Sequence, residues 1–113
     1  MPTEPLTWAD FERVEMRTGT VIAAEPFPQA RKPAYKLTID FGAFGTRRTS
    51  AQLTALYQVD ELIGKQVVAV VNFPPKQIAQ FKSECLILGA VADDGTVTLL
   101  QTERLTENGL RIA

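Results

Sequence analysis

GKQVVAVVNFPPKQI, residues 64–78, contains a buried strand together with the residues that end it. Residues 67–71 form an unbroken apolar run whose β-branched composition is typical of a strand covered on both faces. The Pro74-Pro75 pair follows closely. Because proline has no backbone N–H and restricts the residue before it to extended geometry, the strand has to end near Phe73. The sequence therefore predicts that Asn72 and Phe73 lie at the rim of a sheet.

This rim has two interpretations, and the sequence leaves both open. In the first, the amide of Asn72 and the ring of Phe73 bind a peptide, since a proline-stiffened backbone loses little entropy on binding. In the second, Asn72 is a turn residue whose amide bonds to nearby backbone. The first interpretation, with Arg47 at its border, assigns a peptide-binding site to six residues: Gln52, Asn72, Phe73, Pro74, Pro75 and Lys76.

Length and composition indicate an ordinary globular protein. The chain has 113 residues, 45% of them hydrophobic and 22% charged, which fits a single domain over residues 1–113. The N-terminus has no basic leader followed by an apolar segment, and the longest apolar run, residues 85–92, is too short to cross a bilayer. We therefore expect a soluble, cytoplasmic protein that does not insert into membranes.

The residues that usually carry catalysis are scarce. The chain has one cysteine and no histidine, which removes Cys/His and Ser/His/Asp arrangements and any zinc site built on imidazole. Cys85 begins an apolar, strand-like run and is expected to be a small buried thiol. No glycines fall into a phosphate-cradling pattern, and the acidic residues are scattered. We expect no catalytic residue, no metal site and no cofactor.

The start of the chain predicts a short helix. Thr7 and Asp10 have the spacing of a capping box, with Asp in place of the usual Glu or Gln, so a helix should cover residues 8–13. So short a helix has to be stabilised by packing, yet Trp8 and Phe11 have little core to pack against in one small domain. We therefore place Trp8 and Phe11 in the interface of a homodimer.

The remaining pattern predicts an all-β fold. Five strands are expected, at residues 16–24, 34–41, 46–51, 66–72 and 85–91. A short helix should lie in residues 54–63, and Asp94-Gly95 should turn the fifth strand into a hairpin with residues 97–100. Gly19, inside the first strand, is read as a bend or bulge. Together these elements predict a five-stranded OB-fold barrel with a short N-terminal helix, a short helix between strands three and four, and a C-terminal hairpin extension.

Several separated motifs carry a resemblance to a known family. The chain resembles the tRNA-binding OB-fold domain family, which includes free-standing dimeric tRNA-binding proteins and domains appended to aminoacyl-tRNA synthetases. Within this family it is most similar to the CsaA-type branch. The residues that carry the resemblance are Phe11-x-x-Val14-x-Met16-Arg17-x-Gly19-Thr20-Val21, Phe27-Pro28-x-Ala30-Arg31-Lys32-Pro33-Ala34-Tyr35-Lys36-Leu37, Ser50-Ala51-Gln52, Leu62-x-Gly64-Lys65-x-Val67, Asn72-Phe73-Pro74-Pro75-Lys76 and Ser83-Glu84.

The resemblance implies a homodimeric OB-fold that binds macromolecules and catalyses nothing. CsaA-type proteins are described as chaperones for secretory precursors, so the implied partners are unfolded or precursor polypeptides and the export machinery. The alternative is a tRNA-binding protein. The tRNA-binding relatives usually have a Ser-Gly pair where this chain has Ala51-Gln52, a departure that favours the CsaA-type branch.

Charge is uneven along the chain. The net charge is −1 and the sequence pI about 5.4, which is poor for a protein that binds phosphate backbone through counterion release. Residues 26–59, however, carry five basic side chains and one acidic side chain. These basic residues are either an ordinary solvated face or a nucleic-acid-binding face. To the nucleic-acid interpretation the resemblance adds Ser83, giving the candidates Arg31, Lys32, Lys36, Arg47, Arg48 and Ser83.

Overall fold

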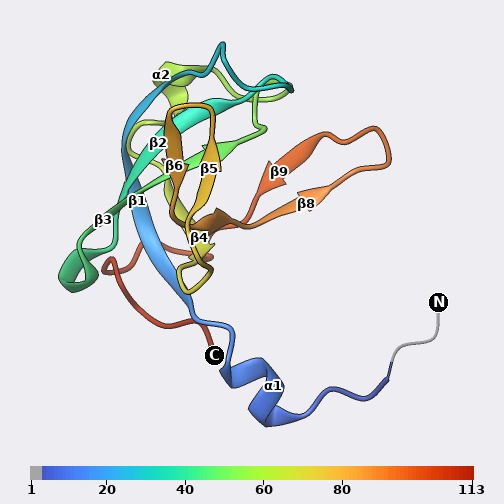
Figure 1. Cartoon of the computed structure of the whole chain (residues 1–113). Coiled ribbons are helices and arrows are strands. Elements are labelled where there is room, and N and C mark those ends of the chain that lie inside the picture. The colour runs from blue at the N-terminus through green and yellow to red at the C-terminus, as the bar shows by residue number, and fades with distance from the viewer. Residues whose placement is uncertain (1–3) are drawn as a thin grey trace.

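The computed structural model describes residues 4–113, which form a barrel with two projections (Figure 1). The elements in chain order are α1 (Trp8–Glu12), β1 (Met16–Pro26), β2 (Tyr35–Asp40), the 3₁₀ turn η1 (Gly42–Phe44), β3 (Thr46–Ala51), α2 (Val59–Leu62), β4 (Gln66–Val70), β5 (Lys76–Ile78), β6 (Phe81–Ser83), β7 (Leu86–Ile87), β8 (Gly89–Val91) and β9 (Val97–Leu99).

Five antiparallel strands make a nearly closed barrel. They pair in the order β3-β2-β1-β4-β7, with the long β1 curving through the centre (Figure 1). The sheet closes where β3 approaches β7: the Thr49 hydroxyl donates to the carbonyl of Cys85 at 2.7 Å, and Arg47 donates to the carbonyl of Val71 at 2.7 Å. The predicted OB-fold barrel, with its two short helices and its C-terminal hairpin, is confirmed.

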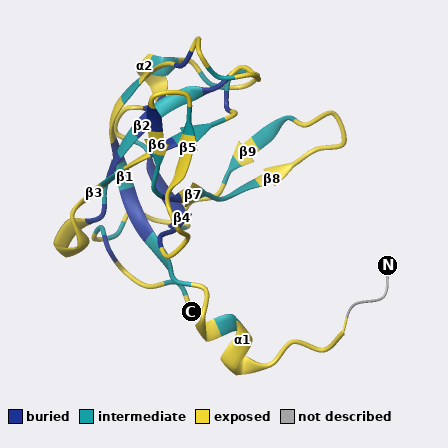
Figure 2. Ribbon diagram, in the orientation of Figure 1, coloured by how far each residue is buried: buried dark blue, intermediate teal, exposed yellow. Residues whose placement is uncertain are grey.

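The barrel interior is one hydrophobic core. Every residue of β4 is buried, as its unbroken apolar run predicts (Figure 2). Leu37, Ile39 and Phe41, from β2 and its end, are buried in the same core. The intervening β2 residues are only partly buried, as expected from the two-residue period of a strand. This core holds β3 and β4 in fixed positions, so their ends and the Phe73 turn have a rigid support.

The bend in β1 lies at a different residue from the one predicted. The pairing of β1 with β2 shifts register between Val21 and Ala23, which places the bulge at Ile22. Gly19 is needed for a different reason: a Cβ at this position would lie 2.6 Å from Cγ2 of Ile39 and 2.8 Å from the ring of Phe41. The glycine therefore allows close packing of β1 against the core.

The predicted fifth strand is two strands with different partners. β7 pairs with β4, whereas β8 pairs with β9 in a hairpin that projects from the barrel (Figure 1). Leu88 lies at the change of direction, where its N–H donates to the carbonyl of Val68 and its own carbonyl accepts from the N–H of Leu100. The Asp94-Gly95 turn is at the predicted place, with Gly95 at a φ of 89°.

The β5–β6 hairpin was not predicted, and it carries a small core of its own. The rings of Phe27 and Phe81 pack edge to face, 5.3 Å apart, and Ala34 is buried with them. Ala79, in the tight turn between the two strands, has a φ of 53°, a conformation that costs a residue with a Cβ about 1–2 kcal/mol.

The C-terminal segment runs along β1 and is held by hydrogen bonds. The buried Gln66 side chain donates to the carbonyl of Thr106 at 2.7 Å and accepts from the N–H of the same residue at 3.1 Å. Arg17 donates to the carbonyl of Gly109 at 2.8 Å and stacks on the ring of Phe44 at 3.8 Å. The chain turns at Asn108-Gly109, as predicted.

Candidate binding surfaces

A groove lies between the β5–β6 hairpin and the barrel. Its volume is about 440 Å³. Its apolar wall includes Phe73, which is 54% exposed, and Leu86, which is 49% exposed. Large side chains that are half exposed beside a hollow can bury their apolar surface against a ligand. The lining residues are Ser50, Gln52, Phe73, Pro74, Lys76, Ile78, Ser83, Cys85 and Leu86.

Four of the six residues assigned to peptide binding line this groove. They are Gln52, Phe73, Pro74 and Lys76, whereas Asn72 and Pro75 are absent from its wall. Asn72 has a different task. Its side-chain oxygen accepts from the N–H of Glu15 at 3.0 Å, and its nitrogen donates to the carbonyl of Arg13 at 2.6 Å. The amide thereby ties the connection between α1 and β1 to the end of β4, which agrees with the second interpretation of Asn72.

A second hollow, of about 610 Å³, adjoins the groove. Arg31 and Lys32, from the loop between β1 and β2, lie on its wall. Ser50, Gln52, Lys76 and Ile78 line both hollows, so the two meet along these side chains. The structure thus brings part of the predicted peptide site and part of the predicted nucleic-acid site onto one continuous surface.

Lys36 and Arg48 form a separate cluster over the aromatic pair Phe27 and Phe81. The Arg48 guanidinium lies 4.4 Å from the centre of the Phe81 ring, and the Lys36 ammonium lies 5.1 Å from that of Phe27. Lys36 also pairs with Glu25 at 3.5 Å. A hollow of about 140 Å³ opens beside the two cations and the two rings. Because both rings are buried, the two cations are the part of this cluster that a phosphate backbone could contact.

The structure separates Arg47 from Arg48. Neighbouring residues of a strand point to opposite faces, and Arg47 turns toward the end of β4, where it bonds to the carbonyl of Val71. The expectation of one basic face containing both arginines is therefore corrected. Arg47 is partly buried and closes the barrel, while Arg48 is exposed beside Lys36.

Ser83 and Glu84 join the β5–β6 hairpin to β3. The Ser83 hydroxyl accepts from the N–H of Ser50 at 3.1 Å, and the Glu84 carboxylate accepts from the N–H of Arg48 at 3.0 Å. The backbone N–H of Glu84 in turn donates to the carbonyl of Arg48 at 2.7 Å. These bonds cover the open edge of β3, a role that the sequence pattern of Ser83 does not reveal.

Cys85 is the one thiol beside the groove, and it is held in its neutral form. Burial raises the pKa of Cys85 to about 11, so little thiolate forms near neutral pH. Within residues 4–113, no three His, Cys, Asp or Glu side chains gather closely enough to hold a metal ion. In the same part of the chain, no helix has the length and apolar character needed to span a membrane.

The N-terminal helix leaves an apolar surface uncovered. The capping box is present, with the Thr7 hydroxyl accepting from the N–H of Asp10 at 3.1 Å, but α1 buries none of its residues and projects from the barrel (Figure 2). Trp8 is 84% exposed. A hollow of about 340 Å³ lies among Leu6, Trp8, Phe11 and Ala113, so both residues predicted for a dimer interface border it.

Residues 16–111 match a family described as "Putative tRNA binding domain". The chain belongs to this tRNA-binding domain family. Curated relatives include the methionine–tRNA ligase of Methanococcoides burtonii, 33% identical over 92% of this chain, and that of Methanoregula boonei, 36% identical over 97%. The chain spans only 15% and 16% of those two ligases, so the match concerns one of their domains.

Solved structures of CsaA chaperones are similar over their full length. The chaperone CsaA from Bacillus anthracis is 49% identical, with a TM-score of 0.93 over 97% of this chain and 100% of its own. The CsaA chaperone protein from Picrophilus torridus is 48% identical, with a TM-score of 0.89 over 96% of this chain and 100% of its own. A methionyl-tRNA synthetase related protein from Pyrococcus horikoshii is 28% identical, with a TM-score of 0.86 over 98% of this chain and 100% of its own.

Proposed function

We propose that this tRNA-binding domain protein is a non-catalytic, homodimeric chaperone of the CsaA type, which binds unfolded or secretory precursor polypeptides. The observation that carries the proposal is the groove beside Phe73. It offers half-exposed apolar side chains next to the exposed amide of Gln52. Such a site can take up an apolar side chain of a peptide and bond to its backbone, which permits many sequences.

The thiol beside the groove is poorly suited to catalysis. A cysteine nucleophile reacts as the thiolate, whereas burial keeps the thiol of Cys85 protonated. The likeness to CsaA chaperones over the full length of the chain supports a binding module as well. Export machinery would be a further partner if the bound polypeptides are secretory precursors.

The uncovered surface of α1 supports a homodimer. Trp8 is the most exposed large apolar side chain of the described residues, and it borders a hollow whose lining is mostly apolar. A second copy of the chain, related by a two-fold axis, would cover the same surface on both partners.

A second candidate function is tRNA binding, and the cluster of Lys36 and Arg48 over Phe27 and Phe81 favours it. Both rings are buried, so the cations are the groups that would contact the RNA, at its phosphates. Because the net charge of the chain is −1, we expect such binding to be weak and sensitive to salt.

Parallel binding measurements with the purified protein test this ranking. Fluorescence anisotropy would follow a labelled, unfolded precursor and labelled total tRNA, each at low and at high salt. We expect binding of the precursor to persist at both salt concentrations and binding of tRNA to fall steeply. Tight tRNA binding at several hundred millimolar salt, without binding of the precursor, would reverse the ranking.

A further inference from the structure

The two adjoining hollows form one groove whose ends differ in chemistry. One end is apolar, with Phe73, Pro74 and Leu86 on its wall. The other end carries Arg31 and Lys32. Between them, the polar side chains of Ser50 and Gln52 belong to both hollows. A ligand that fills the groove therefore meets apolar surface at one end and positive charge at the other.

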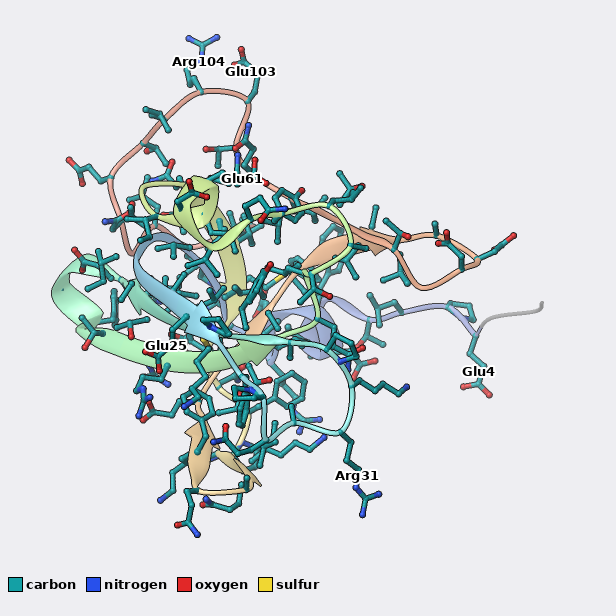
Figure 3. All side chains as sticks on the ribbon, turned by 90° about the horizontal axis from the view of Figure 1, so that it is seen from above. Glu4, Glu25, Arg31, Glu61, Glu103 and Arg104 are labelled. Carbon is teal, nitrogen blue, oxygen red and sulfur yellow. The ribbon has the colours of Figure 1, made fainter. Side chains whose placement is uncertain are left out.

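The positive charge of this groove is not neutralised by the protein. Arg31, Lys32 and Lys76 line the two hollows, and no carboxylate does so within residues 4–113. None of the three cations forms an ion pair with another described residue. Figure 3 shows Arg31 reaching outward from its loop, with the four labelled acidic residues, Glu4, Glu25, Glu61 and Glu103, on other parts of the chain, Glu25 being the partner of Lys36. The groove thus has a positive end in a protein whose net charge is −1.

We propose that the groove selects extended polypeptide segments in which apolar side chains lie next to a run of carboxylates. This inference rests on the proposed polypeptide-binding function and names the class of segment. Apolar side chains would bury the exposed surface of Phe73 and Leu86, while Asp or Glu side chains would pair with Arg31 and Lys32. Segments rich in Lys or Arg would place like charges together at that end, which lowers their affinity.

A polypeptide fits this groove better than RNA does. Phosphates recur at every nucleotide, so one end of a bound RNA would set its charge against the apolar wall of Phe73, Pro74 and Leu86. The cluster best suited to nucleic acid, Lys36 and Arg48 over the aromatic pair, borders a different hollow. The amide of Gln52, in the middle of the groove, suits a peptide backbone that has both donors and acceptors.

Three fluorescein-labelled peptides of equal length test the inference. Each has the same apolar half, followed by a half rich in Glu, in Gln or in Lys. We expect the Glu peptide to bind about tenfold more tightly than the Lys peptide at low salt, since the few ion pairs it can form are exposed and individually weak. The charge-reversed variant Arg31→Glu/Lys32→Glu should invert this order, and Lys76→Glu should reduce the preference.

Phe73→Ala serves as the matched control, because it should weaken all three peptides by a similar factor and leave their order unchanged. A melting curve of each variant establishes that the fold is intact. Equal binding of the three peptides, or tighter binding of the Lys peptide, would overturn the inference and leave the proposed function standing. Failure of all three to bind would overturn both. Displacement of the Glu peptide by tRNA, with tRNA binding lost in the Arg31→Glu/Lys32→Glu variant, would assign this end of the groove to nucleic acid instead.

Discussion

Asn72 and Phe73 follow one another at the end of β4, and their side chains meet different surroundings. The amide of Asn72 is used by two backbone groups of the α1–β1 connection, whereas the ring of Phe73 faces the groove. The composition of this rim therefore predicts its place in the fold but not the role of each side chain. That role depends on whether a distant segment, here residues 13–15, approaches the strand end.

Ala79→Gly should stabilise the protein, because Ala79 has a φ of 53° and glycine adopts this conformation without a Cβ clash. The gain should be about 0.5–1 kcal/mol, since part of the relief is offset by the greater freedom of glycine in the unfolded chain. Urea unfolding measures the change. The control is Gln80→Gly in the same turn, where φ is not positive and glycine should be destabilising. Equal losses in both variants would contradict a strained Ala79.

Glu15→Gln should lower stability above about pH 5, and the loss should shrink as the pH falls. The guanidinium of Arg17, bonded at 2.8 Å, holds the pKa of Glu15 below its usual range. A carboxyl whose pKa is lowered on folding stabilises the folded state above its unfolded pKa, and this contribution is lost as the pH drops through the folded pKa. For a partly exposed pair the loss should be at most about 1 kcal/mol. Thermal melts of both proteins from pH 3 to pH 7 check this, and a difference independent of pH would contradict it.

Among the elements, those fixed by local signals could be predicted from the sequence. The capping box marks α1, and the alternation of apolar and polar residues marks β2 at Tyr35–Asp40. The β5–β6 hairpin could not be predicted, because its three-residue strands have little periodicity and depend on packing against Phe27. The break at Leu88 was missed for a related reason: an apolar run does not reveal that its two halves pair with different strands.

Of the candidate site residues, four of the six assigned to peptide binding share the groove, because a strand end followed by prolines fixes where the chain turns. The second hollow depends on the loop that carries Arg31 and Lys32, whose position next to β5 is set by tertiary packing. Charge counting along the chain located these cations but could not assign them to a face. The function of both sets of residues stays a prediction.

At the level of β3, replacement of adjacent arginines should have different effects. Arg48→Ala should weaken tRNA binding, because Arg48 lies exposed beside Lys36. The slope of log affinity against log salt concentration should fall by about one, as expected for the loss of one phosphate contact. Arg47→Ala should instead lower the melting temperature, since the carbonyl of Val71 loses its donor. Binding isotherms at several salt concentrations and thermal melts on both variants measure these effects. A larger loss of tRNA affinity in Arg47→Ala than in Arg48→Ala would contradict this division.

The whole molecule consists of a barrel, the small second core of Phe27, Ala34 and Phe81, and two projections, α1 and the β8–β9 hairpin (Figure 1). The groove lies where the β5–β6 hairpin meets the barrel, so its wall comes from two separately packed units. The projecting helix lies outside both cores, which leaves its apolar surface available to a second copy of the chain.

Sedimentation equilibrium should find a dimer at tens of micromolar, a concentration at which even a weak obligate dimer persists. Trp8→Glu should shift the protein to the monomer, because a charge would be buried in the interface. Leu56→Glu is the matched control: Leu56 is also exposed, but it precedes α2, at the other end of the molecule from α1 (Figure 1). A monomeric wild type, or a dimer unaffected by Trp8→Glu, would contradict the proposed interface.

The most direct test of polypeptide binding measures peptide affinity and melting temperature together on Phe73→Ala and Asn72→Ala. We expect Phe73→Ala to lower the affinity for an apolar, acidic peptide by about 1–2 kcal/mol with little change in melting temperature. Asn72→Ala should leave the affinity unchanged and lower stability by about 0.5–1.5 kcal/mol for each of its two solvent-exposed hydrogen bonds to backbone groups. Full peptide affinity in Phe73→Ala would contradict binding in the groove, since polypeptide would then bind elsewhere on the protein.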